Sequence, residues 1–415
     1  RLDAATLTRD RVREFAHLAD RGDLLRADGR PGRSRTGTDS LLVDSWTIEA
    51  KALHPIPFDA FNDPESRLRQ RSTDLIVHPG QAALLRQRSL VVRAIRTTLD
   101  AAGFLEVETP MLHTIHGGAT ARPFTTYINA YGLDLSLRIA PELYLKRLLV
   151  GGMGPIYELG RNFRNEGADA THNPEFTSLE VYQPYADYTD MRHLTEALVK
   201  AAATAVHGVP SLPLPGPDRV RIGLDGVPLV DVGGEWAVVP VLDAVSRATG
   251  RDIGLDTDMD VLLGLAREHG IAVRDDMGPG ALIEELYADL VEPVTLTPTF
   301  FVDFPVETSP LTRPHRSKPG LVERWDLVIA GMEVATAYTE LTDPIDQRRR
   351  LTAQSLKAAA GDPEAMEVDE DFLFALETGM PPTGGLGVGI DRLVMLVTNT
   401  SIRSVLTFPF VKPRA

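Results

Sequence analysis

The sequence of 415 residues contains no cysteine. Its absence excludes disulfide bonds, thiolate chemistry and cysteine-ligated zinc sites, and it agrees with a reducing compartment. Long apolar runs are also missing, since no stretch approaches the roughly 18 apolar residues of a membrane span. The composition that remains, 43% hydrophobic and 24% charged, is that of a globular protein. The length suggests about two or three domains with a sizeable core.

Acidic residues outnumber basic ones, and the formal net charge is −15. This charge argues against a protein that binds nucleic acid over its whole surface. Arginine is nevertheless concentrated near the start of the chain, at Arg9, Arg11, Arg13, Arg21, Arg26, Arg30, Arg33 and Arg35. These residues predict either a local nucleic-acid-binding face or a solvated basic surface, and the pattern alone favours neither.

The first part of the chain predicts a helix followed by two strands. Thr8–Ala19 has helical spacing, and the strand-like runs 24–30 and 41–53 are joined by a turn that contains Pro and Gly. Residues 54–78, rich in Pro and Arg, are predicted to be a linker. A second helix over 82–99, followed by an edge strand over 104–110 that ends in Pro, comes next.

The later part alternates between strands and helices. A strand is predicted over 133–139, and Pro141 then begins a helix whose first turn holds Glu142. Further helices are predicted over 190–207 and, as three stretches, within 241–292, before a strand over 299–304.

The segment 157–185 carries the densest set of chemically useful residues. It predicts a short strand over 156–159, a polar loop and a second strand over 175–182. The loop holds Arg161, Arg164, Glu166 and His172. In the second strand Phe176, Ser178, Glu180 and Tyr182 share one face, and Thr177, Leu179 and Val181 share the other, which is predicted to be core.

This segment supplies what an anionic, planar ligand needs. An arginine can grip phosphate with two hydrogen bonds, a histidine can reach a distal phosphate, and a phenylalanine can stack on a base. A carboxylate and a phenol on one sheet face are costly to bury unless a charged group docks there. The alternative interpretation of the same residues is a salt-bridged hairpin.

Three further patterns are candidates for binding. Asp326 and Glu333, in strand-like sequence, could hold Mg²⁺ against phosphate oxygens, although solvated strand edges explain them equally well. If that strand is regular, Thr336, Tyr338 and Glu340 share a face. In 381–397 a glycine-rich turn is predicted to precede a helix, and Arg392 lies in its first turn, where the helix dipole disfavours a cation.

Three short sequence motifs together resemble those of one enzyme family. FRNEG followed by HNPEF resembles motif 2 of class II aminoacyl-tRNA synthetases, in the form found in lysyl-tRNA synthetases. The helix before FLEVETP, together with that strand, resembles motif 1, and GLGVGIDR resembles motif 3. The resemblance runs from about Glu65 to Pro413, with the motifs in the family's order.

The resemblance implies an α+β fold, in which an antiparallel β-sheet is flanked by helices. It implies a partial OB-fold, anticodon-binding domain over 1–57, a linker over 58–80 and a catalytic domain over 81–415. Within the last, about 208–295 would be a helical insertion. Because only the second half of an OB barrel is recognisable, further residues are expected to precede Arg1.

The resemblance also implies roles for single residues. Arg164 and Arg392 would be catalytic, and ATP would be bound by Arg164, Glu166, His172, Phe176, Gly387, Gly389 and Arg392. Lysine would be bound by Gly118, Glu142, Glu180, Tyr182, Thr336, Tyr338 and Glu340. Asp326 and Glu333 would hold Mg²⁺. The implied partners are L-lysine, ATP as substrate, tRNA(Lys) and a second copy in a homodimer. A buried ε-ammonium needs carboxylate partners, which agrees with this set.

Two departures from the family pattern concern lysine binding. Thr336 stands where the family usually has Asn near the substrate carboxylate, and Thr342 replaces the Asn of TELND. Taken singly, Glu142 is also explained by the dipole at its helix N-terminus.

The stretch RWDLVIAGMEVATAYTELTDP is similar to the synthetase part of LysX-type proteins, in which a membrane-embedded transferase moves lysine from tRNA to phosphatidylglycerol. The predicted function is therefore a lysine–tRNA ligase, serving translation or lipid modification, in the cytoplasm or at the cytoplasmic face of a membrane. A paralogue that lysylates a protein and a non-catalytic lysine or tRNA sensor are the alternatives.

Overall fold

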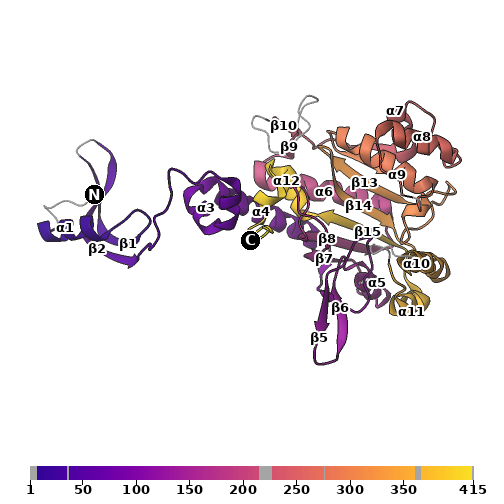
Figure 1. The fold of residues 1–415 in the computed structure, drawn as a ribbon, viewed down its shortest axis with the longest axis horizontal. Coiled ribbons are helices and arrows are strands. Elements are labelled where there is room, and N and C mark those ends of the chain that lie inside the picture. Colours follow the sequence, from indigo (N-terminus) through magenta and orange to yellow (C-terminus); the bar gives the residue numbers. More distant parts are fainter. Residues whose placement is uncertain (1–6, 35–36, 215–226, 275, 360–365, 414–415) are drawn as a thin grey trace. The chain divides into compact units, whose positions relative to one another are not determined.

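The computed structural model describes residues 7–34, 37–214, 227–274, 276–359 and 366–413. It divides into two compact units, residues 1–82 and 83–415. No helix within the described ranges is both long and apolar enough to cross a membrane. Figure 1 shows the ribbon of both units.

The first unit contains a helix, a hairpin and two short helices. Their bounds are α1 (Arg9–Leu18), β1 (Leu24–Arg33), β2 (Asp39–Ala50), α2 (Pro64–Arg69) and α3 (Arg71–Val77). A small core forms where the Phe15 ring of α1 meets the edge of Trp46 on β2 at a centroid distance of 5.2 Å. The predicted helix and both strands are thus confirmed, and the predicted linker contains α2 and α3.

The turn predicted at Pro and Gly in this unit is wrong. Pro31 and Gly32 lie inside β1, paired with Leu41 and Ser40 of β2. Among the described residues β1 has only β2 as a neighbour, so its other edge tolerates a residue that lacks an N–H group. The described hairpin does not form a closed barrel, and the OB-fold stays a prediction.

The second unit is built on an eight-stranded mixed sheet. In order across the sheet the strands are β11 (Ala237–Pro240), β12 (Thr299–Val302), β13 (Arg324–Ile329), β14 (Met332–Thr339), β15 (Thr383–Gly389), β8 (Glu175–Pro184), β7 (Ile156–Phe163) and β3 (Leu105–Glu106). The inner pairs are antiparallel, as predicted, whereas the outer pairs β11–β12 and β3–β7 are parallel.

Helices cover the sheet in three groups, each with its own core. The first group packs on the odd-numbered face of β8 through Leu179 and Val181, and it comprises α4 (Pro79–Ala101), α6 (Tyr188–His207), α12 (Ile390–Thr398) and α13 (Ile402–Val405). The second packs around Tyr182 and comprises α5 (Glu142–Val150), α10 (Pro344–Ala359) and α11 (Glu370–Gly379). The predicted division of β8 into a core face and a polar face is confirmed.

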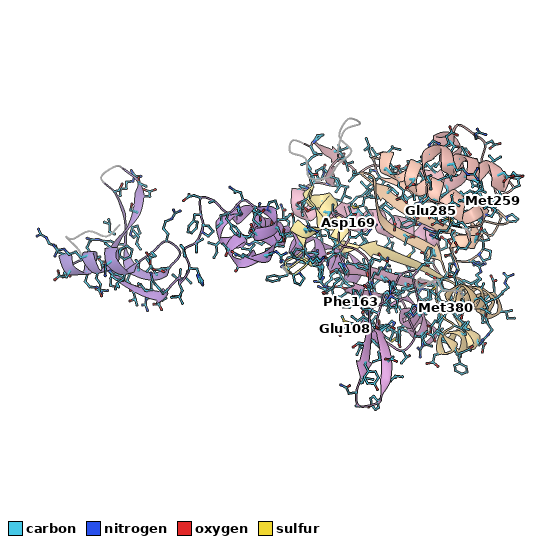
Figure 2. All side chains as sticks on the ribbon, in the orientation of Figure 1. Glu108, Phe163, Asp169, Met259, Glu285 and Met380 are labelled. Atoms are coloured by element: carbon cyan, nitrogen blue, oxygen red, sulfur yellow. The ribbon has the colours of Figure 1, made fainter. Side chains whose placement is uncertain are left out.

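The third helix group is α7 (Val241–Thr249), α8 (Met259–His269) and α9 (Pro279–Leu290), which packs on Phe301 of β12 and Val328 of β13. Figure 2 labels Met259 and Glu285 on these helices. The three helices of the predicted insertion are confirmed, but residues 237–240 form the edge strand β11 of the main sheet. Residues 215–226 of the insertion lie outside the described residues.

The remaining described elements are short. A three-stranded sheet contains β4 (Leu112–His113), β5 (Thr125–Ile128) and β6 (Leu133–Leu137), and Figure 1 shows its β5–β6 hairpin projecting from the main sheet. A two-stranded sheet contains β9 (Ser211–Pro213) and β10 (Leu229–Asp231). Two 3₁₀ turns are η1 (Glu292–Val294) and η2 (Val306–Thr308).

Two local predictions around the motifs are wrong. Arg161, predicted in the loop, lies in β7, which continues to Phe163. The glycine-rich residues 383–389, predicted as a turn, form β15 in the middle of the sheet, and the helix after them begins directly at Ile390. Glycine usually weakens a strand, and it is kept where another group approaches the backbone closely.

Candidate active site

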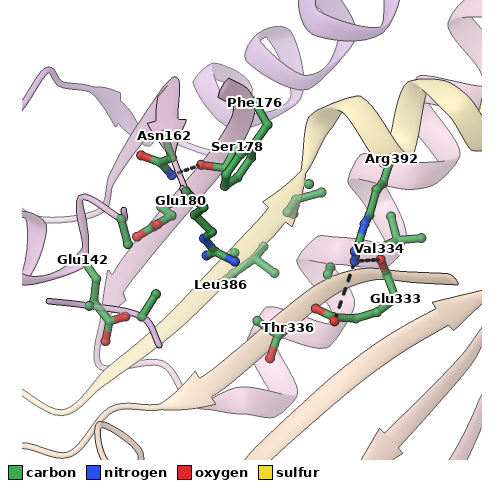
Figure 3. Close-up of a pocket in the computed structure, with 18 of the residues that line it drawn as sticks. Glu142, Asn162, Phe176, Ser178, Glu180, Glu333, Val334, Thr336, Leu386 and Arg392 are labelled. Carbon is green, nitrogen blue, oxygen red and sulfur yellow. Dashed lines mark hydrogen bonds and ion pairs between the residues drawn. The ribbon is translucent and has the colours of Figure 1, made fainter. Parts of the chain in front are cut away.

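A cavity of about 490 Å³ lies over the polar face of β8, β14 and β15. It collects all but one of the residues that the sequence predicts for the site: Gly118, Glu142, Arg164, Glu166, His172, Phe176, Glu180, Tyr182, Glu333, Thr336, Tyr338, Glu340, Gly387, Gly389 and Arg392. The exception is Asp326, which does not line the cavity. Figure 3 shows Glu142 and Glu180 at one side and Arg392 with Glu333 at the other, with Thr336 between them.

Glycines of β15 form the floor of this cavity. In the antiparallel register Gly387 lies between Glu180 of β8 and Thr336 of β14. Gly385 likewise lies between Tyr182 and Tyr338. Because these positions of β15 carry no side chain, the long side chains of the two neighbouring strands border open space instead of a filled core.

A close approach explains Gly385 in particular. A Cβ atom at this position would lie 1.8 Å from Oε1 of Glu340 and 2.8 Å from Cε1 of Tyr182. No larger residue fits unless Glu340 moves. The glycine therefore makes room for this buried carboxylate.

A β-bulge in β14 turns Glu333 toward the cavity. The register with β13 shifts so that Leu327 pairs with Ala335 while Val328 pairs with Glu333, which leaves Val334 as the extra residue. A bulge changes the face on which the following side chains emerge. Glu333 therefore lines the same cavity as Thr336, although a regular strand would place the two on opposite faces.

One end of the cavity is acidic. Glu142, Glu180 and Glu340 are buried there, with Glu340 only 1% exposed. Lys146, one turn after Glu142 on α5, is fully buried, and its Nζ lies 2.6 Å from Oε1 of Glu142 and 2.5 Å from Oε2 of Glu340. The other oxygen of Glu340, Oε1, is buried and accepts no hydrogen bond from any described residue. This oxygen of Glu340 can therefore accept a hydrogen bond from a cationic group of a ligand.

The acidic end holds protons more tightly than isolated carboxyl groups do. Burial, helped by the charge of Glu142, raises the pKa of Glu180 to about 8, although Tyr182 donates a hydrogen bond of 3.0 Å to it. Burial also raises the pKa of Glu340 to about 8, and Lys146 opposes this rise. A cation that entered this end would replace the bound protons.

The other end of the cavity is cationic. Nε of Arg164 is buried without a hydrogen-bond partner among the described residues, and its Cζ lies 5.1 Å from the ring centre of Phe176. Burial lowers the pKa of Arg164, and the carboxylates of Glu166, Glu333 and Glu180 oppose this shift only in part. An arginine in this environment can donate hydrogen bonds to an anionic ligand.

Arg392 joins two of the predicted motifs. Its Nη1 donates to the backbone carbonyl of Glu333 at 2.8 Å, and its Nη2 donates to Nε2 of His172 at 3.0 Å. Since that nitrogen accepts, the ring proton is on Nδ1, which lies 2.9 Å from the carboxylate of Asp169. The loop that carries His172 is thereby held at the first turn of α12.

The two predicted metal ligands differ in their surroundings. Asp326 accepts hydrogen bonds from Nη2 of Arg324 at 2.7 Å and from Oγ1 of Thr336 at 2.6 Å. Glu333 lines the cavity, and burial together with the charge of Asp326 raises its pKa. Burial and the charge of Glu333 also raise the pKa of Glu292, at the start of η1, to about 8. In the described ranges no group of three or more acidic or histidine side chains is arranged as a metal site.

Three cations in or beside the site are not among the residues that the sequence predicts: Lys146, Arg138 and Arg324. Lys146 resembles the ordinary surface pair of a helix, because it follows Glu142 by four residues. Arg138 of the segment after β6 pairs with Glu158 of β7 at 2.5 Å, and Arg324 pairs with Asp326, two positions further along β13. The spacing of Arg324 and Asp326 on one strand face was a usable signal, whereas nothing in the sequence marked Arg138.

The mixed sheet, with motif-bearing strands around a single cavity, defines the catalytic domain of a class II aminoacyl-tRNA synthetase. The family described as "tRNA synthetases class II (D, K and N)" matches residues 63–412, and the chain belongs to this family.

Relatives with high identity are described as "Lysylphosphatidylglycerol biosynthesis bifunctional protein LysX". The protein from Gordonia bronchialis is 55% identical over 403 residues, which are 96% of this chain and 35% of the relative. Those from Mycobacterium avium and Mycobacterium tuberculosis are 54% and 53% identical over 99% of this chain. The chain spans about 35% of the length of these relatives.

Proposed function

We propose that this chain is a lysine–tRNA ligase, which activates L-lysine with ATP and transfers it to tRNA(Lys). One observation carries the proposal: a single cavity is lined by Arg164, whose buried Nε has no hydrogen-bond partner among the described residues, and by Glu340, whose buried Oε1 has none there either. An anionic group and a cationic group are therefore expected to bind side by side.

The charges at the acidic end favour lysine. Glu142, Glu180 and Glu340 supply three carboxylates, and Lys146 offsets one of them. Two negative charges remain for the two ammonium groups of lysine. A neutral amino acid would leave buried charges unpaired, which discriminates by roughly 10⁴-fold or more when a site is built to pair a polar group.

The cationic end suits ATP. Arg164 would grip the α-phosphate, and Phe176 would stack on the adenine, with Glu166 near its amino group. Arg392 and His172 would bind the distal phosphates. The bare backbone at Gly387 and Gly389 leaves room for the nucleotide, because the nearest atom to a Cβ at Gly387 would lie at 3.9 Å, on Thr336.

Mg²⁺ would bind at Glu333, which lines the cavity close to Asp326, so the donor set fits a hard cation. Asp326, the second predicted ligand, shares its oxygens with Arg324 and Thr336. The ion would neutralise phosphate charge.

The chemistry needs no general base in the first step. A carboxylate oxygen of lysine attacks the α-phosphorus, the bond from this phosphorus to the bridging oxygen of the β-phosphate breaks, and pyrophosphate leaves with the electron pair. Arg164 would stabilise the charge on the α-phosphoryl oxygens. A ribose hydroxyl at the tRNA 3′ end then attacks the carbonyl carbon of lysyl-adenylate. The bond from this carbon to the phosphate oxygen breaks, AMP leaves with the electron pair, and the hydroxyl proton passes to the departing phosphate. Thr336 would lie near the lysine carboxylate, where the family usually has Asn.

The wider context follows from the relatives. Since they are named as bifunctional proteins in lysylphosphatidylglycerol biosynthesis, we propose that this synthetase supplies lysyl-tRNA to a fused membrane transferase outside the chain. The basic residues 9–35 would belong to an OB-type domain that binds tRNA, and the domain would act as a homodimer.

Amino-acid-dependent exchange of pyrophosphate into ATP, measured with each of the twenty amino acids and Mg²⁺, tests the proposal. We expect exchange with lysine and loss of exchange in Arg164→Met. Transfer to an unfractionated tRNA pool distinguishes a tRNA ligase from a paralogue that lysylates protein. Calorimetric binding of lysine without any exchange would instead indicate a sensor and contradict the proposal.

A further inference from the structure

A lysine of the protein itself pairs with two of the carboxylates that line the acidic end of the cavity. Lys146 is 0% exposed, and its ammonium group bridges Glu142 on α5 and Glu340 at the end of β14. These two carboxylates come from segments about two hundred residues apart in the sequence. The bridge therefore joins the helix α5 to the sheet at the point where a substrate ammonium is proposed to bind.

The geometry of the bridge leaves part of each carboxylate for a ligand. Lys146 contacts Oε1 of Glu142 and Oε2 of Glu340. Oε1 of Glu340 is the oxygen that faces the bare backbone of Gly385 and has no hydrogen-bond partner among the described residues. A carboxylate has about four lone-pair positions, so one carboxylate can bind Lys146 and a second ammonium group together.

From this arrangement we infer that Lys146 is a positioning residue for substrate selection: it holds Glu142 and Glu340 in place and sets the number of carboxylate charges left for the ligand at two. This inference rests on the proposed lysine ligase activity and deepens it. Without Lys146, three carboxylates would face one another in a buried end of the cavity, and protons would have to replace the lost cation.

The groups that face Lys146 define what should change when it is replaced. Glu142 lies on its own helix, Glu340 follows β14, and β8 contributes Glu180 and Tyr182 to the same end. The ring of Phe372 on α11, 6.0 Å from Nζ, covers another side. Because Lys146 opposes the effect of burial on Glu340, its loss raises the pKa of that carboxyl further.

The test compares Lys146→Met with the wild type in lysine-dependent pyrophosphate exchange at a series of pH values. At pH 7 we expect KM for lysine to rise about 10- to 100-fold, since a carboxyl group that keeps the extra proton no longer pairs with the ammonium group of the ligand. KM for ATP and kcat at saturating lysine should change little. The ratio of the two KM values for lysine should fall toward one as the pH rises, because the extra proton is then lost.

Lys200→Met is the matched control. Lys200 also pairs with a glutamate four residues earlier on a helix, Glu196 of α6, at 3.2 Å, but it lies outside the cavity. It should leave KM for lysine unchanged at every pH. Lys146→Arg, which keeps the charge, should retain the pH profile of the wild type even if the larger group alters KM.

The outcomes separate this inference from the proposed function. No exchange by the wild type with lysine would contradict the proposed function. If the wild type catalyses exchange, two results would overturn the positioning role of Lys146. One is an unchanged KM for lysine in Lys146→Met, and the other is a rise in this KM that is equal at all pH values. If Lys146→Met does not fold, as judged by thermal unfolding, the comparison is made with Lys146→Gln, and an unchanged pH profile in that variant would overturn the role equally.

Discussion

Replacement of Gly385, on the floor of the cavity, by alanine should weaken lysine binding. The added methyl carbon would lie 1.8 Å from Oε1 of Glu340 and 2.8 Å from Tyr182, well inside van der Waals contact. The backbone of β15 is fixed on both sides by β14 and β8, so the carboxylate has to turn away. Turning moves Oε1 of Glu340, which has no hydrogen-bond partner among the described residues and is proposed to accept from a substrate ammonium.

The size of the effect follows from two contributions. Overpacking a buried site costs typically about 1–3 kcal/mol of folding free energy. Loss of a hydrogen bond to a charged group costs about 1.5–3 kcal/mol of binding free energy. Since each 1.4 kcal/mol is about a factor of ten, KM for lysine should rise roughly 10- to 100-fold.

Pyrophosphate exchange with lysine and ATP varied separately is the assay, and Gly387→Ala is the control. At Gly387 a Cβ atom would meet nothing nearer than 3.9 Å, so the fold should accept it. Its methyl group should instead raise KM for ATP, because this position is proposed to lie under the nucleotide. An unchanged KM for lysine in Gly385→Ala would refute the assignment of Glu340 to the substrate ammonium.

Two further predictions concern protons and stability. Glu180 and Glu340 each have a pKa of about 8, so lysine has to displace their protons when it binds below that pH. The Kd for lysine, measured by calorimetry, should therefore fall as the pH rises from about 6 to 8, by about tenfold per pH unit for each proton released. A Kd independent of pH would contradict this. Arg88 of α4 binds Asp391 and Thr177, so Arg88→Met should leave the buried Asp391 with the backbone N–H of Thr177 but without its arginine. We expect the free energy of unfolding in urea to fall by about 3 kcal/mol, whereas the exposed control Arg33→Met should lower it little.

The sequence predicted the motif-bearing strands well because strict alternation specifies a face. Phe176 and Tyr182 were assigned to one side of β8 from period two alone, and the cavity lies there. The glycine-rich strand was not predictable in this way. Propensity disfavours glycine in a sheet, and the reason for it, the approach of Glu340 to Gly385, exists only after distant segments have packed.

The electrostatic partners were the least predictable part of the site. Lys146 follows Glu142 at helix spacing, a pattern that usually lies on a solvated surface, and its burial depends on Glu340 from a distant segment. Arg324 neutralises Asp326, so a carboxylate that was expected in the cavity turns to an arginine instead. The direction of Glu333 was equally unpredictable, because it depends on the β-bulge at Val334, which the sequence does not mark.

One comparison tests most directly whether the acidic end of the cavity selects an amino acid with two ammonium groups. Pyrophosphate exchange is measured with lysine and with norleucine, which has the same chain without the ε-ammonium group. We predict a kcat/KM for lysine that is about 10⁴-fold higher or more, since norleucine leaves a buried carboxylate unpaired. Similar values for the two amino acids would contradict the account.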